Sequence, residues 1–113
     1  MKVMIFPHVT IIGVYRLLAV PVQQLCYAIN KVLSLSCSQF IIFIGDFNIN
    51  WLDESNRRPL YNLFVNRNNY RQLISTYTTD NQTTIDHIYT NLPESQANAH
   101  ILETYFSTSQ YVH

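Results

Sequence analysis

The stretch FIIFIGDFNIN, residues 40–50, decides the fold of this chain. Its first five residues are all apolar, which is typical of a strand that is covered on both faces. Asp46 and Asn48 follow the apolar run. Because side chains alternate along extended backbone, we expect these two on one side of the strand and Phe47 packed on the other. A carboxylate at such a strand end can orient a water, and an amide can donate to an oxygen that gains charge.

The same residues also fit an ordinary turn. Gly, Asp and Asn tolerate left-handed backbone and bond to their own main chain, so they commonly follow a strand without any function. On residues 45–48 alone, the turn is the more common outcome. A second motif changes this balance.

That second motif is TTIDHIYTN, residues 83–91, a β-branched stretch that carries Asp86. Asp is depleted in strands, and a half-buried carboxylate costs free energy unless a donor or a cation meets it. His87 is the direct neighbour of Asp86 and should project to the opposite face. We therefore expect Asp86 to find a partner other than His87.

Together with VTIIGVYR, residues 9–16, these motifs resemble the endonuclease/exonuclease/phosphatase superfamily with its DNase I-like fold. The closest resemblance is to endonuclease domains of non-LTR retrotransposons, over residues 9–106. It implies hydrolysis of DNA phosphodiesters with Mg²⁺. Asp46 would align the attacking water, Asn48 would stabilise the transition state, and Asp86 would orient a catalytic histidine. Tyr15 is similar to a tyrosine that contacts the scissile phosphate.

Two parts of the family's pattern are missing here. The family's metal-binding Glu and an accompanying Asn lie before the tyrosine strand, and only eight residues precede Val9. The family closes with Ser-Asp-His, whereas Ser107 is followed by Thr108 and Ser109. His113 is read as a terminal residue, not as the missing histidine. We expect a truncated, retrotransposon-derived domain that is inactive alone. The alternative is a non-catalytic remnant or a small nucleic-acid-binding module.

The predicted fold class is α+β, a partial four-layer α/β/β/α sandwich without its N-terminal strands, as one partial domain over residues 1–113. Pro21 opens a predicted helix between the first two strands, which makes a β-α-β crossover. Its apolar stripe comprises Val22, Leu25, Cys26, Ile29, Val32 and Leu33. A second helix is predicted from Pro59 to the Asn68-Asn69 pair, with Leu60, Leu63 and Phe64 inward.

Shorter elements complete the prediction. Residues 70–74 and 100–106 are expected to be extended, and residues 75–84 and 93–98 to be polar connectors. Because a complete sandwich needs about twice this length, we expect one sheet face to expose apolar surface.

Charge gives little direction, since seven basic and seven acidic residues cancel and the pI is about 6.9. Four arginines fall close together and are the candidate contacts to DNA backbone: Arg57, Arg58, Arg67 and Arg71. The more common role of such a group is the solvated face of a helix, with arginines lying over apolar neighbours.

Other signals point away from metals and membranes. Cys26 and Cys37 form no CxxC pair, and we interpret them as reduced packing residues. The four histidines are scattered, which does not indicate a metal cluster. Residues 3–20 faintly resemble a signal peptide or anchor, but polar residues interrupt them and β-branched residues favour a strand. We expect DNA as partner, with no membrane and no small-molecule cofactor. The localisation stays open, with an intracellular protein as the expectation and the nucleus as one candidate compartment.

Overall fold

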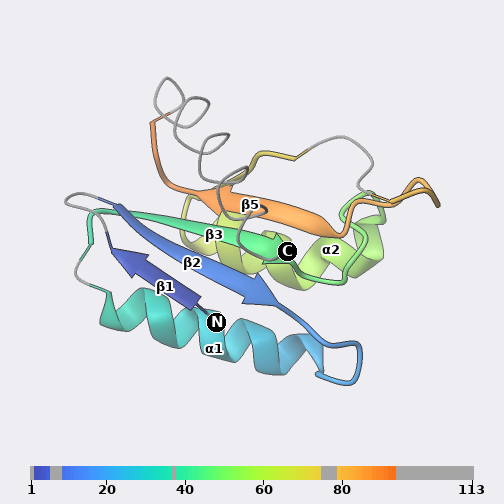
Figure 1. Cartoon of the computed structure of the whole chain (residues 1–113), viewed down its shortest axis with the longest axis horizontal. Coiled ribbons are helices and arrows are strands. Elements are labelled where there is room, and N and C mark those ends of the chain that lie inside the picture. The colour runs from blue at the N-terminus through green and yellow to red at the C-terminus, as the bar shows by residue number, and fades with distance from the viewer. Residues whose placement is uncertain (1, 6–8, 37, 75–78, 94–113) are drawn as a thin grey trace.

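A computed structural model of the chain describes residues 2–5, 9–36, 38–74 and 79–93. They form one mixed sheet with a layer of helices on one of its faces (Figure 1). The elements in chain order are β1 (Lys2–Ile5), β2 (Val9–Tyr15), α1 (Val22–Leu35), β3 (Phe40–Asp46), α2 (Glu54–Leu60), the π-helix η1 (Tyr61–Arg67), β4 (Arg71–Gln72) and β5 (Asp86–Thr90). The predicted α+β class is confirmed.

The sheet has the strand order β1-β2-β3-β5-β4. Strands β2 and β3 are parallel, and the helix α1 joins them, so the predicted β-α-β crossover is confirmed. The other neighbouring strands are antiparallel. The apolar run of β3 therefore lies between two partners at the centre of the sheet, as its composition predicted.

The main core lies between the sheet and the helices. Phe43 from β3 and Tyr89 from β5 are fully buried against Phe64 of η1. The rings of Phe64 and Tyr89 stack with centroids 3.9 Å apart. Burying each such side chain stabilises the fold by about 1.5–3 kcal/mol. This packing holds the strands in place and therefore also positions the side chains at the strand ends.

Helix α1 matches its prediction, with Pro21 preceding it and Leu25 and Ile29 buried. The predicted start of the second helix near Pro59 is wrong, because α2 begins at Glu54. The side chain of Asp53 accepts from the backbone N–H groups of Ser55 and Asn56 and caps this helix. Such a cap is worth about 1 kcal/mol. Pro59 lies inside α2.

The inward positions of the second helical region are as predicted. Leu60, Leu63 and Phe64 are all buried. The region continues beyond α2 as the π-helix η1 and ends at Arg67, directly before the Asn pair. The hydrophobic spacing identified the buried face, whereas the cap at Asp53 set the start.

The N-terminal residues form a strand that the sequence analysis did not predict as a separate element. Strand β1 pairs antiparallel with β2, with Lys2 opposite Gly13. No helix in the described residues is long and apolar enough to cross a membrane. The extended segment predicted for residues 70–74 is reduced to the two residues of β4.

Several predictions fall outside the described residues. They concern the strand at 100–106, residues 75–78 and 94–98 of the two polar connectors, and the individual residues His8, Cys37, His100, Ser107 and His113.

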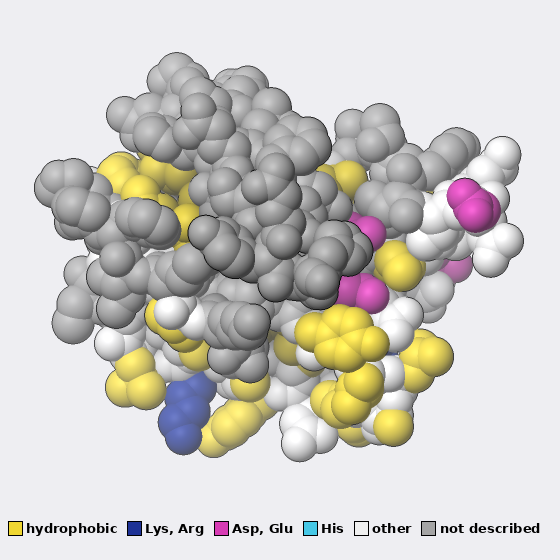
Figure 2. Space-filling view, viewed as in Figure 1, with side chains coloured by type: hydrophobic (Ala, Val, Ile, Leu, Met, Phe, Trp, Pro, Cys, Tyr) yellow, Lys and Arg dark blue, Asp and Glu magenta, His cyan; other side chains and the backbone are white. Residues whose placement is uncertain are grey.

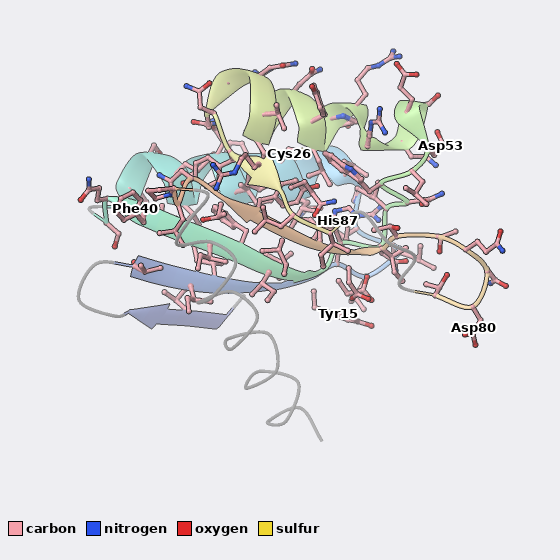
Figure 3. The ribbon with its side chains drawn as sticks, turned by 90° about the horizontal axis from the view of Figure 1, so that it is seen from above. Tyr15, Cys26, Phe40, Asp53, Asp80 and His87 are labelled. Carbon is pink, nitrogen blue, oxygen red and sulfur yellow. The ribbon has the colours of Figure 1, made fainter. Side chains whose placement is uncertain are left out.

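The second face of the sheet carries its own apolar cluster. Ile42 and Ile44 of β3 lie there with Ile11, Ile88 and Leu92, each at most 5% exposed. The expected exposure of apolar surface is therefore not found over these five residues. The described helices all lie on the opposite face (Figures 1 and 3). Strand β3 is apolar on both sides because both of its faces are buried.

Candidate functional site

The strand register brings three of the predicted site residues side by side. Tyr15 is paired with Asp46 in the β2–β3 ladder, and Asp46 is paired with Asp86 in the β3–β5 ladder. Directly paired residues project to the same face, with Cβ atoms about 4.5–5.5 Å apart in antiparallel pairs. We call these three residues the acid–tyrosine row. Its members lie 31 and 40 positions apart in the sequence.

The row lies on the sheet face opposite the helices, at one end of three adjacent strands. Tyr15 points away from the helical layer in Figure 3. Tyr15 is 71% exposed, whereas Asp46 and Asp86 are half-buried. Figure 2 shows acidic side chains next to hydrophobic side chains over the end of β2 and the turn that follows. The row is therefore open to solvent and within reach of a ligand.

Gly45 explains why the strands meet so closely at this end. Its φ of 148° is a conformation that other residues rarely adopt. A Cβ at this position would lie 1.9 Å from the carbonyl oxygen of Val14 in β2. Only glycine therefore allows this approach one residue before Asp46. The sequence pattern predicts Gly45 as a turn residue, although a glycine inside a strand pattern also indicates close backbone approach.

The chain turns immediately after β3. Asn48 has a φ of 54°, and its backbone N–H donates to Oδ1 of Asp46 at 2.8 Å. The turn interpretation of this segment is therefore correct in geometry, and the turn is built on the strand end that carries the row. Phe47 is fully buried on the helix side, as predicted. The Asn48 carboxamide donates to the carbonyl of Arg16 at 3.4 Å.

Arg16 joins the end of β2 to this turn, a role that the sequence analysis missed. The residue is 9% exposed. Its Nη1 donates to the carbonyls of Phe47 and Asn48 at 3.3 and 2.9 Å, and its Nε donates to the carbonyl of Val20 at 3.0 Å. Its backbone N–H donates to the carbonyl of Asp46 at 2.9 Å. The only sequence signal for this role of Arg16 is its position as a charged residue directly after a predicted strand.

The same turn is bonded to the start of β5. The backbone N–H of Phe47 donates to the carbonyl of Ile85 at 3.0 Å, and that of Trp51 donates to Thr84 at 2.8 Å. The backbone N–H of Thr84 in turn donates to Oδ1 of Asn50 at 3.0 Å. These bonds hold the segments before Asp86 and after Asp46 together, so the two acids are positioned by one network.

His87 lies on the other side of the sheet from the row, as expected, and is fully buried (Figure 3). Its Nε2 lies 2.9 and 3.0 Å from the carbonyls of Ile49 and Thr84. Carbonyls only accept, so Nε2 carries the proton and donates. Nδ1 then accepts from the hydroxyl of Tyr89 at 2.9 Å. His87 is a structural residue that ties β5 to the turn after β3.

Burial lowers the pKa of His87 below its usual value of 6.5. The bonds to the Thr84 and Ile49 carbonyls and the charge of Asp46 act in the opposite direction but are weaker. The imidazole is therefore neutral in the folded protein at pH 7. Its ring also stacks on Phe47 with centroids 5.0 Å apart.

The four candidate arginines lie away from the row. Arg57 donates to the carbonyl of Trp51 at 3.2 Å and lies over the Trp51 ring at 5.7 Å. This is the predicted arrangement of an arginine over an apolar neighbour. Arg58 and Arg67 are exposed in the helical layer. Arg71 donates to the carbonyl of Leu92 at the other end of β5.

Arg67 and Cys26 line a groove of about 290 Å³ between α1 and η1. Cys26 is half-buried and packs against the main core. Burial raises the pKa of its thiol, and the nearby charge of Arg67 opposes this. A thiol with a raised pKa is mostly protonated and unreactive at neutral pH. These properties agree with the interpretation of Cys26 as a packing residue.

The described residues contain no group of three or more His, Cys, Asp or Glu side chains that could hold a metal ion. The row itself offers two carboxylates. Comparison of the chain with protein-family models, with curated proteins and with solved structures finds no match.

Proposed function

We propose that this chain is part of a DNase I-like nuclease domain and binds a DNA phosphodiester at the acid–tyrosine row. The observation that carries the proposal is the register Tyr15, Asp46, Asp86 across three adjacent strands. Three motifs that resemble one enzyme family by sequence thus have their polar residues at one end of one sheet. In the proposed domain, the sheet and helices described above form two layers of the four-layer sandwich.

Each side chain of the site has a role that its chemistry allows. The exposed hydroxyl of Tyr15 donates to a phosphate oxygen. Asp46, held by its bond from the Asn48 backbone, accepts a hydrogen bond from a water and orients it. The Asn48 carboxamide has two N–H donors, of which one is directed to Arg16, so the second can serve a phosphate oxygen.

The donor set of the row fits Mg²⁺ in part. Carboxylates are hard oxygen ligands, and Mg²⁺ is commonly bound through one or two carboxylates, waters and substrate phosphates. Asp46 and Asp86 would be those two ligands. When bound, the ion would neutralise charge on the nonbridging phosphate oxygens. Without a cation, two carboxylates repel the phosphate, so DNA binding should require a divalent ion.

We further propose that the chain does not hydrolyse DNA by itself. In the resembled family, the acid corresponding to Asp86 orients a catalytic histidine. His87 is the one histidine in the described residues, and its two ring nitrogens are already bonded on the opposite face. Loss of one member of a cooperating catalytic group commonly costs orders of magnitude in rate.

DNA binding tests the proposal directly. Tyr15→Phe removes the hydroxyl, and the matched control is Tyr27→Phe, because the two tyrosines are 71% and 70% exposed. In fluorescence anisotropy with a labelled duplex and Mg²⁺, we expect Tyr15→Phe to weaken binding about tenfold, the effect of one lost hydrogen bond to a charged group. Tyr27→Phe should bind as wild type. Equal binding by the two variants, or no binding by wild type, would contradict the proposal.

Catalysis is tested separately with a plasmid-nicking assay in Mg²⁺ or Mn²⁺. We expect no nicking by the wild-type chain. Nicking that disappears in Asp46→Ala would overturn the proposed inactivity and would show that the row is catalytic without a histidine partner.

A binding module that uses the arginines is the second candidate, favoured only by the exposure of Arg58 and Arg67 in the helical layer. In that case, salt-dependent retention on DNA would survive Asp46→Ala but would be lost when Arg57 and Arg58 are both replaced by Ala. The first proposal predicts that the double arginine variant still binds in the presence of Mg²⁺.

A further inference from the structure

The turn between β2 and α1 presents two leucines to solvent directly beside the acid–tyrosine row. Leu17 is 56% exposed and Leu18 is 77% exposed. They follow Tyr15 after a single intervening residue, Arg16. Figure 2 shows hydrophobic side chains gathered in this region next to acidic ones. A cluster of exposed apolar side chains at a candidate site indicates a contact surface.

The leucine turn is fixed by hydrogen bonds. The backbone N–H of Val20 donates to the carbonyl of Leu17 at 3.0 Å, which closes the turn. The buried guanidinium of Arg16 donates to the carbonyl of Val20 and also to the turn after β3. The leucines therefore hold a constant position relative to Asp46 and Asn48.

We propose that Leu17 and Leu18 act as a wedge that inserts between DNA bases next to the phosphate bound at the row. This inference rests on the proposed function, because Tyr15 must contact a phosphate for the leucines to reach that duplex. Apolar side chains inserted at a base step unstack it and bend the DNA. The ligand is thus a distorted or flexible duplex step rather than a rigid one.

The reach of the turn fits this ligand. The three residue steps from Tyr15 to Leu18 span at most about 11 Å even when fully extended. Successive phosphates of one DNA strand are separated by about 3.4 Å along the helix axis. When Tyr15 contacts one phosphate, both leucines therefore lie within about three nucleotides of it.

Other occupants fit less well. A stable interface between two copies of a chain buries about 1,600 Å² in total, far more than two leucines and a tyrosine supply. An anionic membrane surface attracts exposed Lys and Arg, and the described residues of this turn carry only Arg16, which is buried.

The experiment uses a short duplex with 2-aminopurine at its centre, whose fluorescence rises on unstacking, and an end label for anisotropy. With Mg²⁺, wild type should bind and raise the 2-aminopurine signal. The double variant Leu17→Ser, Leu18→Ser should bind about tenfold more weakly and give no rise at saturation. The matched control is Leu35→Ser, because Leu35 is 71% exposed at the end of α1 and should leave both signals unchanged.

The outcomes separate the two proposals. If wild type binds but its 2-aminopurine signal does not rise, or rises equally with the double variant, the wedge is refuted and the proposed function stands. If wild type does not bind with Mg²⁺, both are refuted. If the double variant instead abolishes self-association in gel filtration or binding to phosphatidylserine vesicles, the leucines serve another surface and the wedge is refuted. Tyr15→Phe should weaken binding yet keep the fluorescence rise per bound complex.

Discussion

Replacement of Gly45 by alanine should separate the two strands on which the site depends. The Cβ of alanine would lie 1.9 Å from the Val14 carbonyl oxygen and 2.8 Å from its carbon. Ordinary contact begins at 3.4 Å, so the backbones must move apart by about 1.5 Å. A shift of this size breaks hydrogen bonds that span 2.9 Å, such as the bond from Arg16 N–H to the Asp46 carbonyl.

The size of the effect follows from two contributions. A residue other than glycine at a φ of 148° costs about 1–3 kcal/mol in backbone strain. Loss of about two hydrogen bonds between β2 and β3 costs about 0.5–1.5 kcal/mol each. The free energy of unfolding should therefore fall by about 4 kcal/mol, a large part of the roughly 5–15 kcal/mol typical of a domain.

Urea unfolding at 25 °C measures this loss. The chain has a single tryptophan, Trp51, which lies in the turn after β3 and reports on that region by fluorescence. The control is Gly13→Ala at the only other glycine, whose φ is not positive. A loss for Gly45→Ala within about 1 kcal/mol of the loss for Gly13→Ala would refute the close-approach argument.

Two further predictions concern charge. His87 has a lowered pKa in the folded state, so below pH 6.5 the unfolded chain takes up a proton that the folded chain does not. As the pH falls below 6.5, the free energy of unfolding should decrease by up to about 1.4 kcal/mol per pH unit. Above pH 6.5 the neutral His87 causes no such loss of stability. His87→Gln should reduce this slope in urea titrations, and an unchanged slope would contradict the assignment. Asp46→Asn removes a like charge directly opposite Asp86 and should raise stability by about 0.5 kcal/mol. High salt should diminish that gain, and a gain independent of salt would indicate another cause.

The sequence was sufficient to locate β2, β3 and β5 and the row at their ends, because two independent patterns coincide there. The apolar runs of residues 9–16 and 40–46 indicated buried neighbouring strands, and their polar ends indicated where the strands meet solvent. The parallel pairing of β2 with β3 follows from the helix between them. Asp86 at the start of β5 completes the row.

The parts that were missed depend on contacts between distant segments. The start of α2 at Glu54 is set by the Asp53 cap, whereas the prediction relied on Pro59. Arg16 acts through carbonyls 31 and 32 positions away, and no local pattern indicates which carbonyls a buried guanidinium will meet. The pairing of β1 with β2 depends on register that residues 2–5 do not encode alone.

The distribution of unfavourable features favours a binding surface at the end of the sheet. The helix side is packed with stacked rings, and in the described residues no buried side-chain polar atom lacks a hydrogen-bond partner. The row side instead has two like charges in direct register, a left-handed Asn48, a glycine in a conformation closed to other residues, and exposed leucines. The paired like charges and the left-handed Asn48 each cost stability, and the exposed leucines bury no apolar surface in the core. Local departures from optimal folding are expected where a surface serves a ligand. If the row binds a phosphate as proposed, the like charges and the exposed leucines beside it have one explanation, whereas a plain turn accounts only for Asn48.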